Sequence, residues 1–371
     1  MRITHISAYA FRYTRRRPVS MSGGRDLGTA DSTMVRLSTD EGLEGWGEVC
    51  PLGPAYMQSF VGGARAAIAE MAPALIGADP RQLDLFYCLM DGALMGHSYA
   101  KSAIDIAAWD LAGKAAGLPV SHLLGGSYRD RFPLYCTVSL GGPDAMAEQL
   151  AEFAAEGYRR FQVKVGDDWR EDVRRVKACV DAAGEPEMLI ADANAGWSEP
   201  DAVHFAAAFG ASGIYIEQPC ADLEACAQVS RRSACPFILD ESAVSVDALL
   251  RARALQAFDG VVLKLSRLGG ITRVRVAREL VAEWGLRCTI EDAGGGDVVA
   301  AAMAHCTAST RPANLLNGWL TNINVKEHVA LDAPSHRDGY GFVPQGPGLG
   351  IEIDVERLGK PIYECGSAHP G

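Results

Sequence analysis

The chain has 371 residues, of which 48% are hydrophobic and 22% are charged. This is the composition of a globular protein, long enough for one large domain and a smaller one, and a core of that size needs no disulfides. The formal net charge of −11 argues against the basic surfaces that bind nucleic acid. The short basic stretch RYTRRR at residues 12–17 is interpreted as a solvated strand end or loop.

Cysteine usage and the N-terminus predict a cytoplasmic protein. The ten cysteines include no CxxC pair, and the closest group, Cys220, Cys226 and Cys235, fits no common zinc spacing. We therefore expect free thiols in a reducing compartment. The N-terminus lacks the long apolar segment of a signal peptide, and no window holds 18 uninterrupted apolar residues, so neither secretion nor a membrane span is expected.

Residues 1–127 are predicted to form an α+β domain. The stretches 3–13 and 32–49 alternate as antiparallel strands do, with a turn at residues 40–42. Helices follow, including one over residues 99–117.

From residue 128 onward, short strands alternate with helices at a spacing of roughly 25 residues, as in (β/α) barrels. The eight predicted strands are residues 133–139, 160–165, 188–194, 213–219, 237–242, 260–266, 287–293 and 314–320. A doubly wound sheet is the alternative, but its phosphate loop is poorly matched by VSLGGPDA after the first strand. We predict a barrel over residues 128–325, with residues 326–371 packing back on the first domain.

Charged residues follow successive predicted strands, at the end of a barrel where active sites lie. A single polar strand end is explained by nearby solvent. Nearby solvent does not explain the order lysine, acid, acid, acid, lysine on strands two to six, because converging charges are costly unless something balances them. Strand seven adds two further acids. The residues in question are Lys164, Asp192, Asn194, Glu217, Gln218, Asp240, Glu241, Lys264, Ser266, Glu291 and Asp292.

Three of these carboxylates, on adjacent strands, predict a metal site. Asp192, Glu217 and Asp240 supply hard oxygen ligands without histidine or cysteine, which favours Mg²⁺, or alternatively Mn²⁺, over zinc. Asn194 and Glu241 are expected to orient the ligands or a lysine.

Lys164 and Lys264 would flank that metal. A general base needs a pKa near roughly 7–8, below the ordinary lysine value of about 10.4. We expect the cation, the other lysine and burial to lower the pKa of each lysine, and the carboxylates to oppose this lowering. The chemistry that needs such a base beside a metal is removal of the proton α to a carboxylate, with the metal holding the enediolate.

This constellation resembles the enolase superfamily, in its mandelate racemase/muconate lactonizing enzyme branch. The motifs GLEGWGE, AKSAIDIAAWDLAGKAAGLPVSHLLGG, DAN, IEQP, DES and LKLSRLGGIT carry the resemblance over nearly the whole chain. It implies an α+β capping domain on a modified (β/α)7β barrel, Mg²⁺ at the three carboxylates, and a homo-oligomer. Lys164 matches the second lysine of the family's KxK motif, and Lys264 matches the acid/base on the opposite face. Gln162 replaces the first lysine.

Within this branch, the chain is most similar to epimerases of proline betaine and hydroxyproline betaine. The segments RFQVKVG, PLGPAYM, GHSYAKSAIDIA, NGWL and VPQGPGLG carry that similarity. It implies that Tyr56 and Trp319 surround a quaternary ammonium, which aromatic rings bind by cation–π attraction. Gln162 and Asp292 are the other expected substrate contacts. Gly294 stands where that group has a bulky aromatic residue, which predicts a larger pocket.

We therefore expect a Mg²⁺-dependent racemase or epimerase that inverts the α-carbon of an N-methylated proline with two lysines. The alternatives are a dehydratase of cis-3-hydroxyproline or an acid sugar, a muconate-type cycloisomerase, a Schiff-base aldolase and a non-catalytic betaine-binding protein. A dipeptide epimerase is disfavoured because WLTNINV lacks an aspartate pair, and a mandelate-type enzyme because strand six supplies lysine. His97, Lys101 and His305 are expected to have packing roles.

Overall fold

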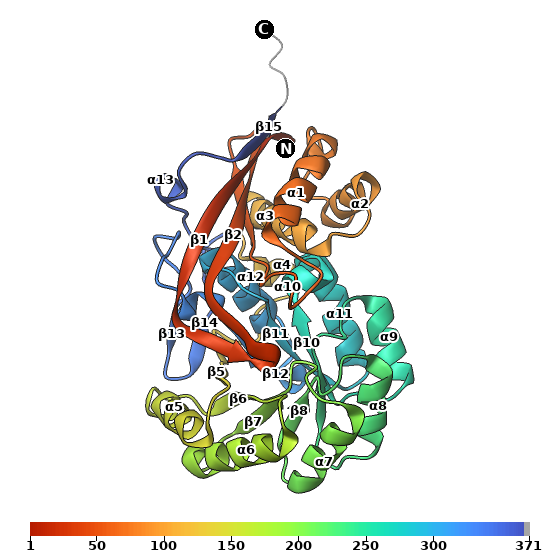
Figure 1. The fold of residues 1–371 in the computed structure, drawn as a ribbon. Helices are drawn as coiled ribbons and strands as arrows, with labels where there is room; N and C mark the ends of the chain where they lie inside the picture. The colour runs from red at the N-terminus through yellow and green to blue at the C-terminus, as the bar shows by residue number, and fades with distance from the viewer. Residues whose placement is uncertain (367–371) are drawn as a thin grey trace.

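The computed structural model describes residues 1–366 and confirms the predicted fold class. An antiparallel capping sheet and its helices precede a parallel eight-stranded barrel (Figure 1). In the same view, the long β1–β2 hairpin, in red, extends from the capping domain down to the barrel. The cap and the barrel together therefore form the candidate site.

The capping sheet has the strand order β15-β1-β2-β3, so the C-terminal strand pairs with the N-terminal one. Its strands are β1 (Ile3–Met21), β2 (Arg25–Thr39), β3 (Glu44–Val49) and β15 (Tyr363–Gly366). Its helices are α1 (Val61–Leu75), α2 (Leu83–Ala93), α3 (Ser98–Ala116) and α4 (Val120–Leu123). Helix α3 packs directly on β3, because a Cβ atom at Gly47 would lie 1.7 Å from the Ala103 carbonyl oxygen. Two glycines of the GLEGWGE motif, Gly45 and Gly47, are thus required by helix packing.

The barrel strands run in sequence order and all pair in parallel. They are β5 (Cys136–Val138), β6 (Arg160–Lys164), β7 (Met188–Asp192), β8 (Tyr215–Glu217), β9 (Phe237–Leu239), β10 (Gly260–Lys264), β11 (Arg287–Glu291) and β12 (Leu315–Gly318). A parallel bridge between Leu134 and Gly318 closes the ring between its first and last strands. Ile190 of β7, Ile238 of β9 and Val262 of β10 pack together with Leu316 of β12 in a small apolar cluster.

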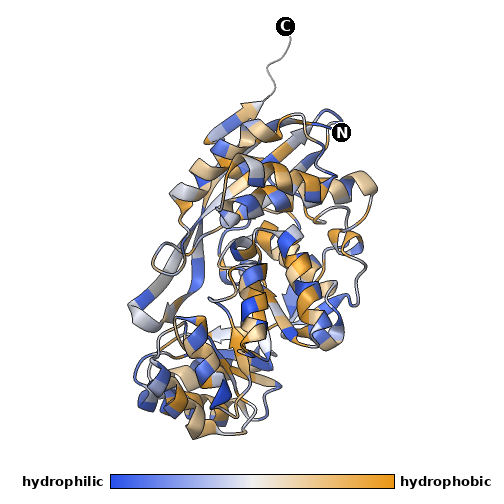
Figure 2. Ribbon diagram, turned by 90° about the vertical axis from the view of Figure 1, so that its right-hand side faces the viewer, coloured by the Kyte–Doolittle hydropathy of each residue, from blue (hydrophilic) through white to orange (hydrophobic). Residues whose placement is uncertain are grey.

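Helices follow the strands as predicted, and several begin at a side-chain cap. Ser198, for example, accepts a hydrogen bond from the Asp201 amide at the start of α7. The barrel helices are α5 (Pro143–Ala155), α6 (Trp169–Ala183), α7 (Glu199–Phe209), α8 (Leu223–Arg231), α9 (Val246–Ala254), α10 (Leu265–Leu268), α11 (Ile271–Glu283) and α12 (Asp297–Ala308). The remaining short elements are β4 (Arg131–Pro133), β13 (His336–Arg337), β14 (Tyr340–Phe342) and α13 (Val355–Leu358). Figure 2 shows that hydrophobic and hydrophilic residues alternate along these helices, as expected when one face packs on the barrel.

Two buried carboxylates of the capping domain accept hydrogen bonds from the first turns of barrel helices. Asp105 of α3 accepts from the Thr272 amide at 2.9 Å, at the start of α11. Glu48 of β3 accepts from the Gly296 amide at 2.8 Å, at the start of α12. Burial raises the pKa of both carboxyls to about 7, although these hydrogen bonds oppose the shift. Both contacts fix the cap over the barrel mouth.

The three residues expected to have packing roles all have local partners. His305 is buried between the Ser121 amide and the Leu349 carbonyl oxygen. Lys101 pairs with Asp91 at 2.7 Å. His97 precedes α3 with a left-handed φ of 50°, and its ring contacts the Tyr99 hydroxyl at 3.3 Å.

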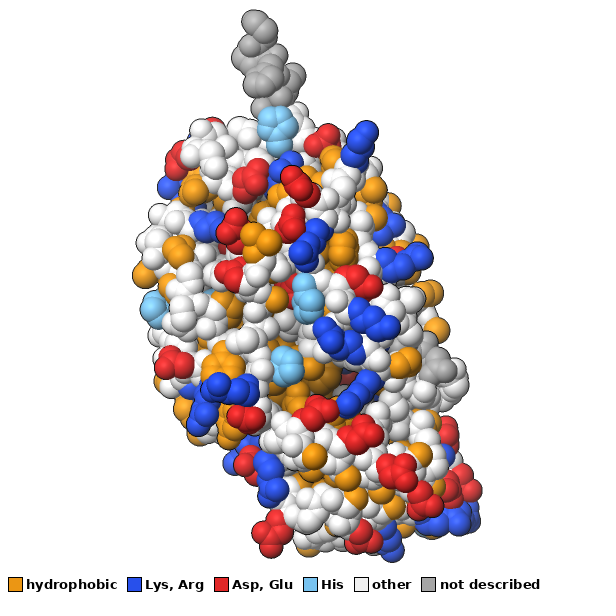
Figure 3. Space-filling model, turned by 90° about the vertical axis from the view of Figure 1, so that its left-hand side faces the viewer, with side chains coloured by type: hydrophobic (Ala, Val, Ile, Leu, Met, Phe, Trp, Pro, Cys, Tyr) orange, Lys and Arg blue, Asp and Glu red, His pale blue; other side chains and the backbone are white. Residues whose placement is uncertain are grey.

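All ten cysteines lie in the described part of the chain and are free thiols, as predicted. Over residues 1–366, no helix is both long and apolar enough to cross a membrane. On the face seen in Figure 3, basic and acidic side chains are interspersed, so no large patch of one sign forms there.

Candidate active site

The predicted charged residues converge at the carboxyl ends of the barrel strands. Strand register places Lys164 beside Asp192, and Asp192 beside Glu217. On the other side of the barrel, it places Lys264 beside Glu291. These five side chains are all buried. They therefore meet in an environment where unbalanced charge is costly.

Strand alternation explains how a lysine comes to lie inside the barrel at β6. Phe161 and Val163 pack in the hydrophobic core, while Gln162 and Lys164 line the chamber at the barrel mouth. The chamber has a volume of about 70 Å³. It is lined by Arg15, Val19, Met21, Leu52, Tyr56, Tyr135, Thr137, Gln162, Lys164, Lys264, Glu291, Asp292, Ala293 and Trp319.

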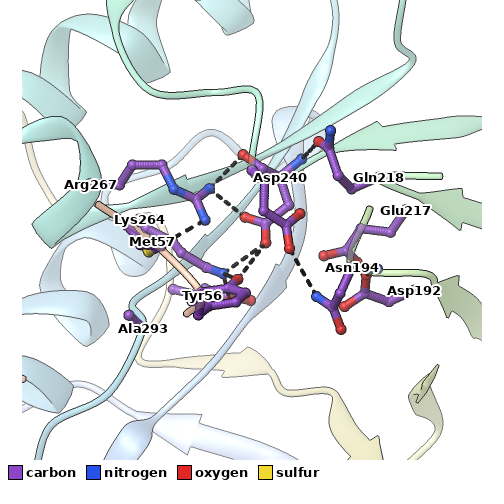
Figure 4. Close-up of polar contacts among 12 residues, drawn as sticks. Tyr56, Met57, Asp192, Asn194, Glu217, Gln218, Asp240, Lys264, Arg267 and Ala293 are labelled. Atoms are coloured by element: carbon purple, nitrogen blue, oxygen red, sulfur yellow. Dashed lines mark hydrogen bonds and ion pairs between the residues drawn. The ribbon is translucent and has the colours of Figure 1, made fainter. Parts of the chain in front are cut away.

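The two lysines have different surroundings. Lys164 Nζ donates to Asp192 Oδ2 at 2.5 Å. Lys264 Nζ contacts Asp240 Oδ2 at 2.8 Å and the Tyr56 hydroxyl at 2.8 Å (Figure 4). It also contacts Glu291 Oε1 at 3.0 Å. Lys264 is therefore held by three groups and Lys164 by one.

The expected lowering of the lysine pKa values is not found. Burial alone would lower the pKa of Lys164, but Asp192 and Glu217 raise it by more. Burial is likewise overcome at Lys264, where Asp240 and Glu291 raise the pKa well above its ordinary value. The carboxylates are the dominant neighbours of both lysines here. The expected lowering included the charge of a bound cation, so it stays a prediction for the site with its metal.

Asp240 is held in place by Arg267, which the sequence-based prediction missed, and by Gln218, which it placed at the rim without a role. Arg267 Nη1 donates to Asp240 Oδ1 at 2.6 Å, and Gln218 Oε1 accepts from the Asp240 amide at 3.0 Å (Figure 4). Gln218 has a left-handed φ of 34° and also accepts from the Ser242 amide. Its position next to Glu217 was a signal, since a polar residue directly after a strand-end ligand can orient the next strand.

Several oxygen atoms at this rim are buried without hydrogen-bond partners. They are Glu217 Oε1, Glu241 Oε2 and Asn194 Oδ1. Burial and the neighbouring Asp192 and Asp240 carboxylates raise the pKa of Glu217 well above its ordinary value. Orphaned oxygens among mutually repelling carboxylates fit a hard divalent cation.

The predicted ligands are not already arranged around a metal position. Among residues 1–366, no three His, Cys, Asp or Glu side chains form a ready-made metal cluster. The reason is visible in the contacts: Asp192 turns to Lys164, and Asp240 turns to Lys264 and Arg267. Coordination by both aspartates would require these ion pairs to rearrange.

The two expected orienting residues contact each other. Asn194 Nδ2 donates to Glu241 Oε1 at 3.1 Å, and the Asn194 amide donates to Asp192 Oδ1 at 2.9 Å. Asn194 has a φ of 44°, which turns the chain back over the end of β7.

The residues predicted to contact the substrate face the chamber, but some of them also contact other side chains. Tyr56, Trp319, Gln162 and Asp292 all line the chamber. Trp319 stacks on Tyr135, with ring centroids 5.1 Å apart.

Gln162 and Asp292 also hold other residues of the site. Gln162 Nε2 donates to Glu217 Oε2 at 3.0 Å. Asp292 accepts from the Ser266 and Ala293 amides, at 3.1 Å and 2.7 Å.

Gly294 does not simply enlarge the pocket. A Cβ atom there would lie 3.1 Å from the Cys50 carbonyl oxygen and 3.3 Å from Cys50 Sγ. The segment after β3 therefore already occupies the space next to this glycine.

Comparison with known families identifies the class of protein. Residues 5–125 match the mandelate racemase/muconate lactonizing enzyme N-terminal domain, and residues 145–358 match the enolase C-terminal domain-like family. The chain therefore belongs to the mandelate racemase/muconate lactonizing enzyme branch of the enolase superfamily.

Individual relatives carry several activities. The chain is 40% identical to a cis-3-hydroxy-L-proline dehydratase of Roseibium aggregatum, over 98% of this chain and 99% of the relative. It is 31% identical to an N-succinyl-L-Arg/Lys racemase of Bacillus cereus, over 96% and 97%. An enolase superfamily member from Roseovarius nubinhibens, solved in complex with magnesium, superposes with a TM-score of 0.93 at 38% identity, covering 98% of this chain and 99% of that one.

Proposed function

We propose that this protein removes the α-proton of a small, proline-type carboxylic acid with lysine side chains, with Mg²⁺ as cofactor. The observation that carries the proposal is the chamber itself. Lys164 and Lys264 enter it from two sides of the barrel, and the carboxylates of three intervening strands lie between them. Its volume of about 70 Å³ favours a small substrate.

Asp192, Glu217 and Asp240 would hold the Mg²⁺ ion, with Asn194 and Glu241 orienting them. When bound, the ion supplies positive charge next to the substrate carboxylate and offsets the charge that develops there as the proton leaves. Gln162 and Arg267 hold Glu217 and Asp240 by hydrogen bonds, which limits the movement of these ligands.

The difference between the lysines favours dehydration as the reaction. Lys264, held by two carboxylates and Tyr56, is suited to remain protonated and donate a proton. Lys164, with one carboxylate partner, is the better base. Lys164 would take the α-proton, and Lys264 would protonate the departing β-hydroxyl, which leaves as water. The product is a ring enamine that tautomerises to a cyclic imine. The 40% identity to a cis-3-hydroxy-L-proline dehydratase supports this assignment.

Epimerisation of proline betaine or hydroxyproline betaine is the second candidate, because Tyr56 and Trp319 both line the chamber. The ring of Tyr56 is already approached by two cations of the protein, Lys264 Nζ at 5.2 Å and the Arg25 guanidinium at 5.8 Å. Trp319 has one face stacked on Tyr135. The cations at Tyr56 and the stacking at Trp319 occupy ring faces that a quaternary ammonium would need, so we place this activity second.

One experiment separates the two activities. The enzyme with Mg²⁺ is incubated in D₂O with cis-3-hydroxy-L-proline, proline betaine or hydroxyproline betaine, and the products are followed by NMR. Dehydration gives a cyclic imine from the first substrate alone. Epimerisation gives the α-deuterated stereoisomer of a betaine. Absence of both imine formation and α-exchange would refute the proposal.

A further inference from the structure

The chamber contains a cationic side chain that the proposed chemistry does not use. Arg15 of β1 lines the chamber together with the two lysines and Asp292. Its backbone forms an antiparallel bridge with Val325, which fixes its position over the barrel. Its Nε atom is buried without a hydrogen-bond partner, and over residues 1–366 its guanidinium forms no ion pair.

Strand alternation separates Arg15 from its basic neighbours. Tyr13, two residues earlier, is fully buried, and Arg15 follows on the same inner face. Arg12 lies on the other face, where it is 70% exposed and pairs with Asp31. Arg16 is exposed and donates to the Val325 carbonyl oxygen. The interpretation of residues 12–17 as a solvated stretch was therefore wrong for Arg15.

Arg15 is half-buried, with only its Nε shielded from solvent, and a partly buried guanidinium without an ion-pair partner is unfavourable. Burial lowers the pKa of Arg15, since water no longer solvates its charged form. Arginine nevertheless keeps its charge at neutral pH. The other two cations of the chamber, Lys164 and Lys264, both have carboxylate partners. Arg15 thus has an unused donor set facing the space in which a substrate would lie.

The position of Arg15 in the chamber indicates which part of a substrate it would meet. The proposed metal ligands are Asp192 and Glu217, which end β7 and β8, and Asp240, which follows β9. Arg15 lies on the hairpin arm, and it lines the chamber with Leu52 of the cap and with Asp292 and Ala293 after β11. Arg15 and the metal ligands therefore lie on different elements of the fold.

We propose that Arg15 binds a second oxygen acceptor of the substrate, separate from its α-carboxylate. The substrate class is then a small carboxylic acid that bears a ring hydroxyl or a second carboxylate. This inference rests on the proposed function, because it assumes that the α-carboxylate lies next to a Mg²⁺ ion held by Asp192, Glu217 and Asp240. Plain proline, which lacks a second oxygen group, would be a poor substrate.

The kinetic test compares two substrates that differ by one hydroxyl. Turnover of cis-3-hydroxy-L-proline and α-proton exchange of L-proline are measured in D₂O for the wild type and Arg15→Met. We expect the substitution to lower kcat/KM for the hydroxylated substrate by about 30-fold, as for a lost charged hydrogen bond, and to change exchange of L-proline by less than about 3-fold. Arg15→Lys should restore part of the loss, and the control Arg12→Met should behave as wild type. Equal losses for both substrates, or no loss, would overturn the inference.

A second measurement does not depend on turnover. Without ligand, Arg15→Met should melt at the same temperature as the wild type or above it, because it removes a half-buried charge that has no ion-pair partner. Succinate should raise the wild-type melting temperature more than butyrate does, and Arg15→Met should abolish that difference. A less stable Arg15→Met variant, or equal effects of the two acids on the wild type, would contradict the inference. If the wild type acts on neither cis-3-hydroxy-L-proline nor L-proline, the proposed function fails. The melting temperatures with succinate and butyrate still decide the role of Arg15.

Discussion

Lys164 and Lys264 are similar in sequence context but differ in their contacts. Each is the last residue of a barrel strand, and each is buried. Lys164 has Asp192 as its ion-pair partner, whereas Lys264 is held by Asp240, Glu291 and Tyr56. The different partners assign the two lysines different tasks in the proposed reaction, one as base and one as acid.

Substitution of each lysine separately tests that division. Lys164→Ala should lower both α-proton exchange and imine formation from cis-3-hydroxy-L-proline by at least about 100-fold, because it removes the base. Lys264→Ala should retain α-exchange but lose elimination by a similar factor, because it removes the acid. Both are measured by NMR in D₂O. If each variant instead exchanges one stereoisomer only, the lysines act as two bases and the enzyme is an epimerase.

At the scale of the elements, the ends of neighbouring strands are joined by Gln218, which follows β8. Its side chain accepts from the Asp240 and Ser242 amides, and its carbonyl oxygen accepts from the Ala195 amide after β7. One residue thus sets the relative positions of three strand ends that carry the proposed ligands.

Gln218→Met should weaken Mg²⁺ binding by about 10-fold or more, measured by isothermal titration calorimetry. The substitution removes the hydrogen bond from the Asp240 amide to the Gln218 side chain, and hydrogen bonds to ligand residues orient the ligands. The matched control is Gln256→Met, since Gln256 is exposed and also has a left-handed φ, of 52°. Unchanged Mg²⁺ affinity in Gln218→Met would show that Gln218 serves folding alone.

At the scale of the whole molecule, the mouth of the barrel has an excess of negative charge. Six carboxylates meet four cationic side chains there. The carboxylates are Asp192, Glu217, Asp240, Glu241, Glu291 and Asp292, and the cations are Arg15, Lys164, Lys264 and Arg267. A divalent cation would reduce the repulsion, so Mg²⁺ is expected to stabilise the fold as well as the reaction.

Removal of metal should therefore have two effects. Treatment with a chelator should abolish turnover, and Mg²⁺ at about 100 times its dissociation constant should raise the melting temperature by about 3–4 °C through preferential binding to the native state. Asp240→Asn should reduce both effects. Full activity in chelator with an unchanged melting temperature would exclude the metal site.

The contact of the cap with the barrel also predicts a pH dependence of stability. The pKa of Glu48 is raised to about 7 in the folded protein, from about 4.5 when exposed. The native state therefore binds more protons than the unfolded state between these values, and stability falls as pH rises from about 4.5 to 7. Asp105 acts in the same direction. His305, whose pKa is lowered to about 4 by burial, acts in the opposite direction below about pH 6.5.

Glu48→Gln should flatten the decline of the melting temperature between about pH 4.5 and 7, by removing one of the buried carboxyls whose pKa is raised in the folded protein. The control is Glu283→Gln, because the Glu283 side chain is 71% exposed. A decline of the same size in Glu48→Gln and the wild type would mean that Glu48 is ionised throughout this range.

The sequence by itself determined the fold class and the candidate catalytic residues. Hydrophobic alternation and strand-helix spacing specify a (β/α) barrel, and in such a barrel every strand end faces the same mouth. Lys164, Asp192, Glu217, Asp240 and Lys264 could thus be predicted from their positions in the repeat alone.

Only the tertiary structure decided which groups those residues contact. Gln218 and Arg267 hold Asp240, and Arg15 faces the chamber without a partner, because strands and loops distant in sequence meet at one rim. The direction of the lysine pKa shifts was likewise inaccessible from sequence. It depends on whether burial or the nearest carboxylates contribute more, and that balance is set by distances of a few ångströms.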